Sequence, residues 1–274
     1  MANILDKIIA DKRIEVDSRR SQTSLDELKE KVAPLPRCRN FYKAVTKPNP
    51  RGINVIAEVK KASPSAGLIR KDFDPVAIAQ IYQHCGADAV SVLTDEKYFQ
   101  GKLEYIEQIK QAVDLPVMRK DFIVDLWQVY ESRAAGADAI LLIADALKPA
   151  DLMDLMIAAA ELTMTVLLEV HQADTLMKVR SLIGFPKKGN SVLGINNRDL
   201  TTMKTDINTT SRLASLLDNT NELVAESGIK TLQDVAKLKA AGVKAVLIGQ
   251  TLCQHPDIAQ KFQELFQPNS QNPA

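Results

Sequence analysis

Charged and polar side chains repeatedly follow short apolar runs in this sequence, beginning with Glu58 and Lys60. If the runs are strands, Glu58 and Lys60 point to the same side, because side chains alternate in direction along a strand. Further positions of this kind are Arg119, Lys120, Asp121, Asn196, Arg198, Glu169, His171, Glu226, Ser227, Gly249 and Gln250. Pairing and burial near an apolar interior shift pKa values, so a lysine beside carboxylates can take part in proton transfer.

Each of these charges also has a plainer interpretation. A single lysine or glutamate at such a position could belong to an ion pair that closes the mouth of the fold. Together, however, the ends of the runs supply Lys, Glu, Lys, Glu and Asn. Such a concentration is harder to explain by structural ion pairs alone, and it favours acid–base chemistry.

Histidines give no sign of a metal site. His84, His171 and His255 are scattered, and no HxH or HExxH spacing occurs. We therefore expect no metal. His171 is the best placed of the three for function, although a hydrogen-bonded structural role is the preferred interpretation.

The elements that must position these residues form a repeated pattern of apolar run, polar tip and helical segment. The runs begin about 27 residues apart, the period of a strand, a helix and two short loops. Their unbroken apolarity is typical of strands buried on both faces of a parallel sheet. The eight runs are 55–57, 89–93, 116–118, 139–143, 165–168, 191–195, 223–225 and 245–248.

A repeated tetrapeptide supports this organisation. Gly86-Ala87-Asp88-Ala89 and Gly136-Ala137-Asp138-Ala139 each lead into a run, and Gly242-Val243-Lys244-Ala245 is a weaker copy. Glycine there ends one helix and turns the chain toward the next strand. Eight units favour a closed (β/α)8 TIM barrel of the α/β class over an open doubly wound sheet, and no GxGxxG loop is present.

The first 45 residues differ from the rest. Ile4, Leu5, Ile8 and Ile9 recur at helical spacing with charges on the other face, and a second helix is expected at 25–32. We expect a single domain over residues 1–274. It divides into an N-terminal helical extension at 1–45, the barrel at 54–262 and a polar tail at 267–274.

Composition excludes several classes of protein. The 274 residues are 46% apolar, and 35 Lys and Arg against 34 Asp and Glu leave a net charge of +1. Without a basic cluster no nucleic-acid partner is expected, and no apolar stretch approaches the roughly 20 residues that span a membrane.

The three cysteines lack a CxxC spacing and the opening lacks a secretory signature, so we expect a cytoplasmic protein with reduced thiols. The absence of an obvious exposed apolar stripe favours a monomer.

Small residues after the last two runs predict a phosphate site. Glu226-Ser227-Gly228-Ile229 and Ile248-Gly249-Gln250 place free backbone N–H groups where such barrels bind phosphate. Gly228 and Gly249 could instead only terminate strands. Ser63, in the loop after the first run, could join the same site or simply form a turn.

Taken together, the run ends resemble the indole-3-glycerol-phosphate synthase family. The similar stretches are 56–65, 91–95, 119–123, 168–171, 194–200 and 225–229, together with 4–8 and 11–13 in the extension. They keep their order, so the resemblance covers almost the whole chain. It implies ring closure of 1-(2-carboxyphenylamino)-1-deoxyribulose 5-phosphate to indole-3-glycerol phosphate, with loss of CO2 and water, in tryptophan biosynthesis. The small anionic phosphate substrate would be the partner, and no cofactor is implied.

The resemblance also implies residue roles. Lys120 would be the acid that protonates the ketose oxygen, and Lys60 would contact an anionic end of the substrate and deliver a proton during dehydration. Glu58 and Glu169 would position the lysines and remove the anilino proton, with the choice of base left open. Asn196 and Arg198 would bind substrate. The implied phosphate cradle is Ser63, Ser227, Gly228 and Gly249, with Glu226 and Gln250 beside it, and the implied aromatic wall is Phe99, Phe122, Leu141 and Leu200.

Two positions depart from the family pattern. Ala66 stands where many relatives carry Lys, and Gln250 replaces a small or acidic residue, so phosphate affinity is the property affected. Lys60, Lys120 and Arg198 are expected to converge on one rim, with most of the balancing acids elsewhere on the surface.

Two alternative functions fit the sequence less well. Phosphoribosylanthranilate isomerase resembles this chain in architecture, but its chemistry uses a Cys after the first strand and an Asp after the fifth, where Glu58 and Glu169 stand here. A catalytically silent barrel is expected to lose at least one of Lys120, Lys60 and Glu169, and this sequence keeps all three.

Overall fold

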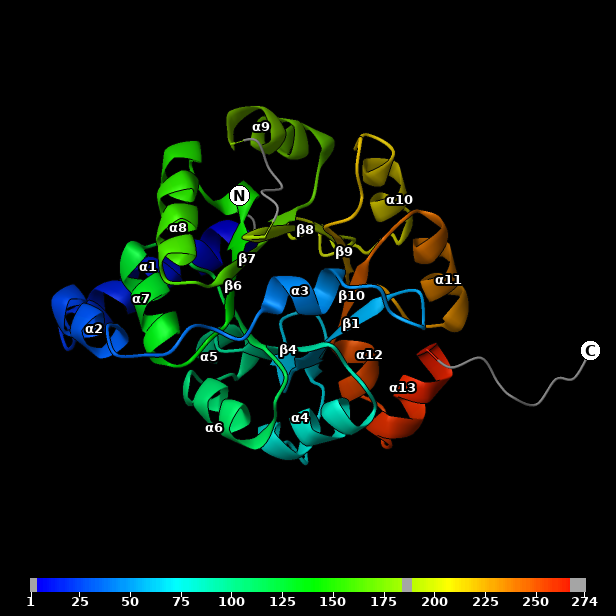
Figure 1. The fold of residues 1–274 in the computed structure, drawn as a ribbon, viewed down its shortest axis with the longest axis horizontal. Coiled ribbons are helices and arrows are strands. Elements are labelled where there is room, and N and C mark those ends of the chain that lie inside the picture. The colour runs from blue at the N-terminus through cyan, green and yellow to red at the C-terminus, as the bar shows by residue number, and fades with distance from the viewer. Residues whose placement is uncertain (1–3, 184–188, 267–274) are drawn as a thin grey trace, which may run out of the picture.

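Eight parallel strands form a closed barrel in the computed structural model, which describes residues 4–183 and 189–266 (Figure 1). The strands are β1 (Asn54–Val59), β4 (Ala89–Leu93), β5 (Val117–Lys120), β6 (Ala139–Ile143), β7 (Thr165–Val170), β8 (Ser191–Asn196), β9 (Leu223–Glu226) and β10 (Ala245–Ile248). Their order around the barrel is β1-β10-β9-β8-β7-β6-β5-β4. Each predicted run is a strand, and the predicted (β/α)8 fold is confirmed. The predicted polar tail lies outside the described residues.

Helices surround the barrel and connect successive strands. They are α4 (Pro75–His84), α5 (Glu96–Phe99), α6 (Glu104–Ala112), α7 (Leu126–Ala134), the 3-10 helix η1 (Ala144–Ala146), α8 (Pro149–Glu161), α9 (Ala173–Ile183), α10 (Asn208–Ala214), α11 (Leu232–Ala240), α12 (Gln250–Cys253) and α13 (Ile258–Phe266). Gly86, Gly136 and Gly242 have φ values of 84°, 92° and 82°, so each repeated glycine ends a helix in the left-handed conformation, as predicted. No helix of the described residues is long and apolar enough to cross a membrane.

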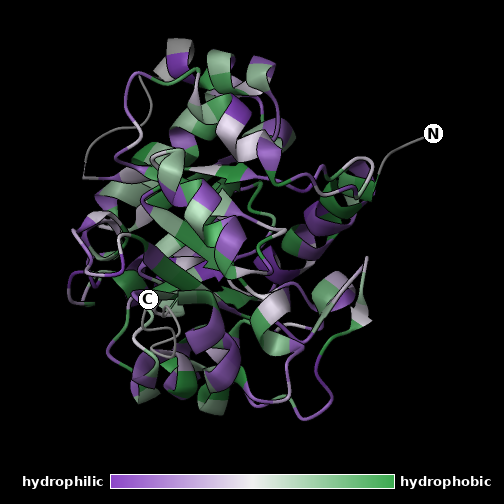
Figure 2. Ribbon diagram, turned by 90° about the vertical axis from the view of Figure 1, so that its right-hand side faces the viewer, coloured by the Kyte–Doolittle hydropathy of each residue, from purple (hydrophilic) through white to green (hydrophobic). Residues whose placement is uncertain are grey.

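The strands bury both of their faces, which explains their unbroken apolarity. Val55, Ala57 and Val59 belong to the apolar layer between strands and helices, whereas Ile56 belongs to the cluster that fills the barrel. Figure 2 shows the apolar strands at the centre and helices of mixed hydropathy around them. The interior is therefore a packed core, and the polar strand ends lie above it.

The N-terminal extension forms three helices, α1 (Ile4–Arg20), α2 (Leu25–Val32) and α3 (Phe41–Thr46). The predicted apolar stripe of α1 is confirmed, because Leu5 and Ile8 are buried in the cluster of the barrel interior. The expectation that charges fill only the outer face is wrong at Lys12, whose side chain is 1% exposed. This lysine is buried because acidic partners from the barrel surround it.

Helix α3 was not predicted, and it closes the amino end of the barrel, where Figure 1 shows it across the centre. Its Phe41 and Val45 are buried in the cluster of the barrel interior. The Asn54 side-chain amide, at the start of β1, donates to the Val45 carbonyl at 3.0 Å. The apolar core is thus covered on this side.

A small hairpin follows β1. It consists of β2 (Ala62–Ser63) and β3 (Gly67–Leu68), which pair antiparallel. The sequence predicted only a loop or turn here. The hairpin places Ser63 and the exposed Leu68 above the strand ends.

Candidate active site

Two adjoining hollows lie at the carboxyl ends of the barrel strands. The hollow that we call the apolar hollow is lined by Leu93, Phe99, Phe122, Leu141, Ile143, Leu200 and Met203, with Ser63, Glu169 and Asn196. The second, the glycine hollow, is lined by Glu226, Gly228, Lys230, Gly249 and Gln250 among others. Glu58, Lys60, Lys120, Arg198 and Ser227 line both. Every residue to which the resemblance gives a role in the site therefore lines one hollow or both.

Lys120 occupies the centre of this arrangement, at the end of β5. Its Nζ atom lies 3.6 Å from Glu169 Oε2 and 3.6 Å from Glu226 Oε2. Burial lowers the pKa of Lys120, but the negative charges of Glu169 and Glu226 outweigh burial and raise it above its usual range. Lys120 is therefore a protonated group that can donate.

The two carboxyl groups beside Lys120 differ in charge. Burial and the neighbouring Glu169 raise the pKa of Glu226 well above its usual range. Burial also tends to raise the pKa of Glu169, yet Lys120 and His171 outweigh it and lower that pKa. Of the two carboxyl groups, Glu226 therefore takes up a proton more readily, and Glu169 is the one that stays ionised. Glu169 Oε2 and both Glu226 oxygens have no hydrogen-bond partner among the described residues.

A second lysine–carboxylate pair lies at the end of β1. Lys60 Nζ is 3.3 Å from Glu58 Oε1, which confirms that the two side chains point the same way. Lys60 also lies 5.4 Å from the centre of the Phe99 ring. The Glu58 carbonyl accepts hydrogen bonds from the Tyr82 hydroxyl and the Cys253 thiol, so the backbone beneath the carboxylate is held in place.

Two glycines make room for these carboxylates. A Cβ atom at Gly249 would lie 2.2 Å from Glu58 Oε1, and one at Gly194 would lie 2.3 Å from Glu226 Oε1. Any larger residue would displace a carboxyl group. From the sequence, Gly249 was assigned to the phosphate site or to a strand end, and Gly194 was given no role, since a glycine within an apolar run gives no sign of what lies against it.

The glycine hollow has the features expected of an anion site. Ser227 and Gly228 have φ values of 64° and 80°, so a tight left-handed turn follows β9. The Arg198 guanidinium reaches the opposite wall, where it donates to Ser65 Oγ at 3.1 Å and to Gln250 Oε1 at 3.4 Å. Ser63 lines the apolar hollow instead, and its Oγ accepts from the Ala66 N–H at 3.2 Å.

The aromatic side chains Phe99 and Phe122 lie together on the wall of the apolar hollow, with ring centres 6.1 Å apart. Leu141 from β6 and Leu200 from the loop after β8 complete the predicted wall. The sequence missed Leu93, Ile143 and Met203, because residues of a general apolar run do not reveal which of them reach the end of the barrel.

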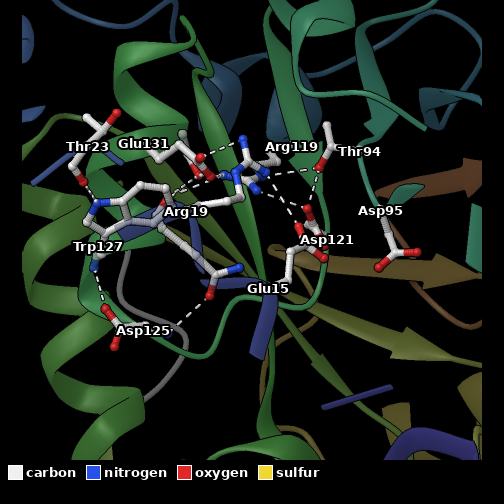
Figure 3. Close-up of polar contacts among 12 residues, drawn as sticks. Glu15, Arg19, Thr23, Thr94, Asp95, Arg119, Asp121, Asp125, Trp127 and Glu131 are labelled. Atoms are coloured by element: carbon white, nitrogen blue, oxygen red, sulfur yellow. Dashed lines mark hydrogen bonds and ion pairs between the residues drawn. The ribbon is translucent and has the colours of Figure 1, made fainter. Parts of the chain in front are cut away.

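The residues on either side of Lys120 in the sequence have other charged partners. Arg119 turns away from the hollows and pairs with Glu131 at 2.7 Å and with Asp121 at 3.0 Å (Figure 3). Asp121 also lies 3.0 Å from Lys12 of helix α1, and Asp95 lies 2.8 Å from the same lysine. Lys12, Asp95, Arg119, Asp121 and Glu131 are called the docking cluster here. It joins α1 to the ends of β4 and β5.

The expectation that most balancing acids lie elsewhere on the surface is wrong. Glu58, Glu169 and Glu226 are buried beside the lysines. Their charge is not screened by water, so each lysine requires a carboxylate close by. Within residues 4–183 and 189–266, no group of three metal-ligating side chains could hold an ion.

A closed parallel barrel with lysines and carboxylates buried at its carboxyl end defines a TIM-barrel enzyme of the acid–base type. The sequence matches the family model for indole-3-glycerol phosphate synthase over residues 5–265. The chain belongs to the indole-3-glycerol phosphate synthase family, as the resemblance predicts. It is a carboxy-lyase of tryptophan biosynthesis that acts on a phosphorylated small molecule.

Individual relatives support this assignment over nearly the whole chain. The indole-3-glycerol phosphate synthase of Geobacillus thermodenitrificans is 46% identical over 263 residues, with 96% of each chain covered. That of Rhodopirellula baltica is 45% identical over 255 residues, covering 93% of this chain and 95% of the relative. Among solved structures, 3-hexulose-6-phosphate synthase is similar with a TM-score of 0.61 at 15% identity, over 78% of this chain and 98% of the other. That likeness concerns the fold alone.

Proposed function

We propose that the two hollows bind 1-(2-carboxyphenylamino)-1-deoxyribulose 5-phosphate and that the lysines and carboxylates between them close its indole ring. The reaction yields indole-3-glycerol phosphate, one CO2 and one water. The observation that carries the proposal is the position of Lys120, which lies between two buried carboxyl groups where the apolar hollow meets the glycine hollow. An aromatic ring and a phosphate fit the two ends.

Substrate binding follows from the chemistry of each hollow. Backbone N–H groups at Ser227, Gly228 and Gly249 suit the phosphate, and Arg198 adds a positive charge. The aromatic ring packs on the wall made by Phe99, Phe122, Leu141 and Leu200. The remaining predicted groups are assigned to the middle of the substrate. Lys60 faces the carboxylate of the substrate, and Asn196 and Glu226 face its hydroxyl groups. Ser63 and Gln250 form part of the walls of the two hollows.

Ring closure requires an acid and a base. The aromatic carbon that bears the carboxylate attacks the ketose carbon, and Lys120 gives a proton to the ketose oxygen, which becomes a hydroxyl. Loss of CO2 returns the electron pair of the broken carbon–carbon bond to the ring. Glu169 removes the anilino proton, because its Oε2 has no hydrogen-bond partner and faces the same space as Lys120.

Dehydration completes the ring. The new hydroxyl leaves as water after it takes a proton from Lys60, whose charge is held close to the site by Glu58 at 3.3 Å. The anilino nitrogen, which regains its proton from Glu169 after CO2 has left, helps to expel the hydroxyl. The ring methylene carbon, the former C1 of the ketose, then loses a proton to a carboxylate of the site, Glu58 or Glu169, and the carbon–carbon double bond forms. Two lysines with separate carboxylates thus supply the two proton deliveries that the reaction needs.

The rival functions lack such support. The ends of β1 and β7 carry Glu58 and Glu169, so the Cys and Asp expected for phosphoribosylanthranilate isomerase are missing at those places. A catalytically silent barrel is expected to lose at least one of Lys120, Lys60 and Glu169, and all three line the apolar hollow here.

Incubation of the purified protein with the proposed substrate, followed by indole absorbance, tests the activity. Lys120→Ala is expected to lower kcat by about 10²- to 10⁴-fold, because a positioned acid contributes that much. Lys29→Ala, which removes an exposed lysine paired with Asp26 on α2, is the matched control and keeps the wild-type rate. Absence of indole product from the wild type contradicts the substrate, and an unchanged rate in Lys120→Ala contradicts the acid.

We also propose that the chain is one folding domain, acts as a monomer and works in the cytoplasm. Exposed large apolar side chains come from several elements of the described chain, and Cys38, Cys85 and Cys253 are unpaired. Sedimentation should give a mass near 30.2 kDa, and unfolding should occur in one transition. A dimer mass, two separate transitions or export of the chain would contradict the respective proposal.

A further inference from the structure

Behind Glu169 lies a line of side chains that the reaction steps do not use. His171 Nδ1 is 2.8 Å from Asp145 Oδ2, and His171 Nε2 is 3.2 Å from Glu169 Oε1. The other oxygen of Glu169 faces Lys120 at 3.6 Å. Asp145 comes from η1 after β6, and His171 and Glu169 come from the end of β7. Asp145, His171 and Glu169 thus form a chain of contacts that begins outside the hollows and ends at Lys120.

The surroundings of His171 favour a proton on each imidazole nitrogen. Its side chain is 7% exposed, and each nitrogen faces a carboxylate. A neutral ring would turn a lone pair toward one of them, which is repulsive. Burial lowers the pKa of His171, but the hydrogen bond to Asp145 and the negative charges of Asp145 and Glu169 outweigh burial and raise that pKa to about 10.

The surrounding charges fit an imidazolium. Thr175 Oγ1 on α9 donates a hydrogen bond to Asp145, and Lys178 lines the same small hollow as Asp145. Around Glu169 the charged groups are Lys120 from β5 and Glu226 from β9, with Glu58 of β1 near Lys120. Glu169 is therefore the carboxylate held between two cations.

We propose that His171 is a positioning residue for ring closure. Asp145 orients the imidazolium, which holds Oε1 of Glu169 and leaves Oε2 free to face Lys120 and the anilino proton. The contact of His171 Nε2 with Glu169 has ion-pair distance but falls short of hydrogen-bond geometry, so the carboxylate is held by charge and stays available as a base. This inference rests on the proposed role of Glu169.

Nuclear magnetic resonance of the imidazole groups tests the charge of His171 in the whole protein. The chain has only three histidines, so His84→Gln and His255→Gln identify the third signal. The His171 signal should remain protonated beyond pH 9, and its midpoint should fall in Asp145→Asn. A midpoint near the ordinary value of about 6.5 would overturn the proposal.

The pH dependence of kcat tests the effect on Glu169. In His171→Gln, the loss of a positive neighbour raises the pKa of Glu169, so the acid limb moves to higher pH by about one unit or more. In Asp145→Asn the imidazolium persists at acid pH but loses the carboxylate that orients it, so the acid limb stays in place. We expect kcat to fall by about 10- to 100-fold, because a displaced catalytic group has effects of this size, with KM little changed. His255→Gln, whose ring contacts only the Asp257 carbonyl, is the control and keeps the wild-type profile.

The outcomes distinguish a failure of the His171 proposal from a failure of the proposed role of Glu169. A lower kcat with an unmoved acid limb in His171→Gln would show a merely structural histidine and overturn the proposal. If His171→Gln does not fold, the wild-type resonance still decides it, because a His171 midpoint of about 6.5 overturns the proposal. If Glu169→Gln keeps the wild-type rate, the proposed role of Glu169 fails, whereas the resonance result on the His171 charge would stand.

Discussion

Two groups of buried charge lie at the same end of the barrel, and they are built differently. In the docking cluster, Lys12 Nζ lies 2.8 Å from Glu15, 2.8 Å from Asp95 and 3.0 Å from Asp121. Around Lys120 the shortest ion pairs are 3.6 Å long, and oxygens of both neighbouring carboxyl groups lack hydrogen-bond partners among the described residues.

The difference shows what each group is for. Close partners on all sides neutralise Lys12, so the docking cluster holds helix α1 on the strand ends. Longer contacts leave the Lys120 region with unfilled hydrogen-bonding capacity that a polar substrate can use. Buried charge alone therefore does not mark an active site, whereas buried charge with unused partners does.

Loss of Lys12 should have the largest effect on stability. Lys12→Met leaves Asp95 and Asp121 without their shared cation, so the free energy of unfolding is expected to fall by about 3–5 kcal/mol. Chemical denaturation measures this, with Lys7→Met, an exposed lysine of the same helix, as the control. A decrease below 1 kcal/mol would mean that the docking cluster does not hold α1.

Gly194→Ala should have an intermediate effect, on the catalytic side of the comparison. The added methyl group displaces the Glu226 carboxyl group, so we expect a loss of about 1–3 kcal/mol in unfolding free energy and a lower kcat/KM. In a Glu226→Ala background the same substitution should destabilise less, because the clash with the carboxyl oxygen is gone. Equal losses in both backgrounds would contradict this explanation.

The stability of the two groups should depend on pH with opposite sign. The folded protein keeps a proton on Glu226 that the unfolded chain loses above pH 4.5, so this group weakens stability as pH rises. Glu226→Gln removes the loss, and its stability relative to wild type should rise by up to about 1.4 kcal/mol between pH 6 and pH 7. Denaturation at both pH values measures this rise, and a constant difference would show that Glu226 is ionised.

For Asp121 of the docking cluster the sign is reversed. Burial tends to raise its pKa, but Arg119 and Lys12 outweigh burial and lower it below the ordinary value. Its stabilisation is therefore fully present above pH 3.8 and is lost as pH falls below that. Asp121→Asn should accordingly destabilise at pH 7 and lose its effect in strong acid.

The smallest effect is expected at the exposed edge of the same helix. Arg20 and Asp125 pair at 3.4 Å with side chains 50% and 34% exposed. Such pairs contribute about 0.2–1 kcal/mol, so Arg20→Ala should lower unfolding free energy by no more than that. A loss as large as that of Lys12→Met would show that burial does not explain the difference in stabilisation between Lys12 and Arg20.

The sequence predicted the barrel and the set of groups at its mouth. Parallel strands buried on both faces give unbroken apolar runs, and the polar residue that ends each run must lie at the common rim. Glu58, Lys60, Lys120 and Glu169 were found in this way. Their roles remain proposals.

Features that depend on distant partners were not predictable. Lys12 belongs to a helix with a charged face, and only the fold shows that Asp95 and Asp121 bury it. The closeness of Gly194 to Glu226 depends on the register of β8 against β9. Helix α3 has only six residues, too few for a periodic pattern to reveal it.

Helix α3 also determines how molecules move in and out. Phe41 and Val45 close the amino end of the packed core. Substrate and product must therefore use the same opening at the opposite end, where the two hollows lie. Product and fresh substrate then compete for one site, so we expect product inhibition to be competitive.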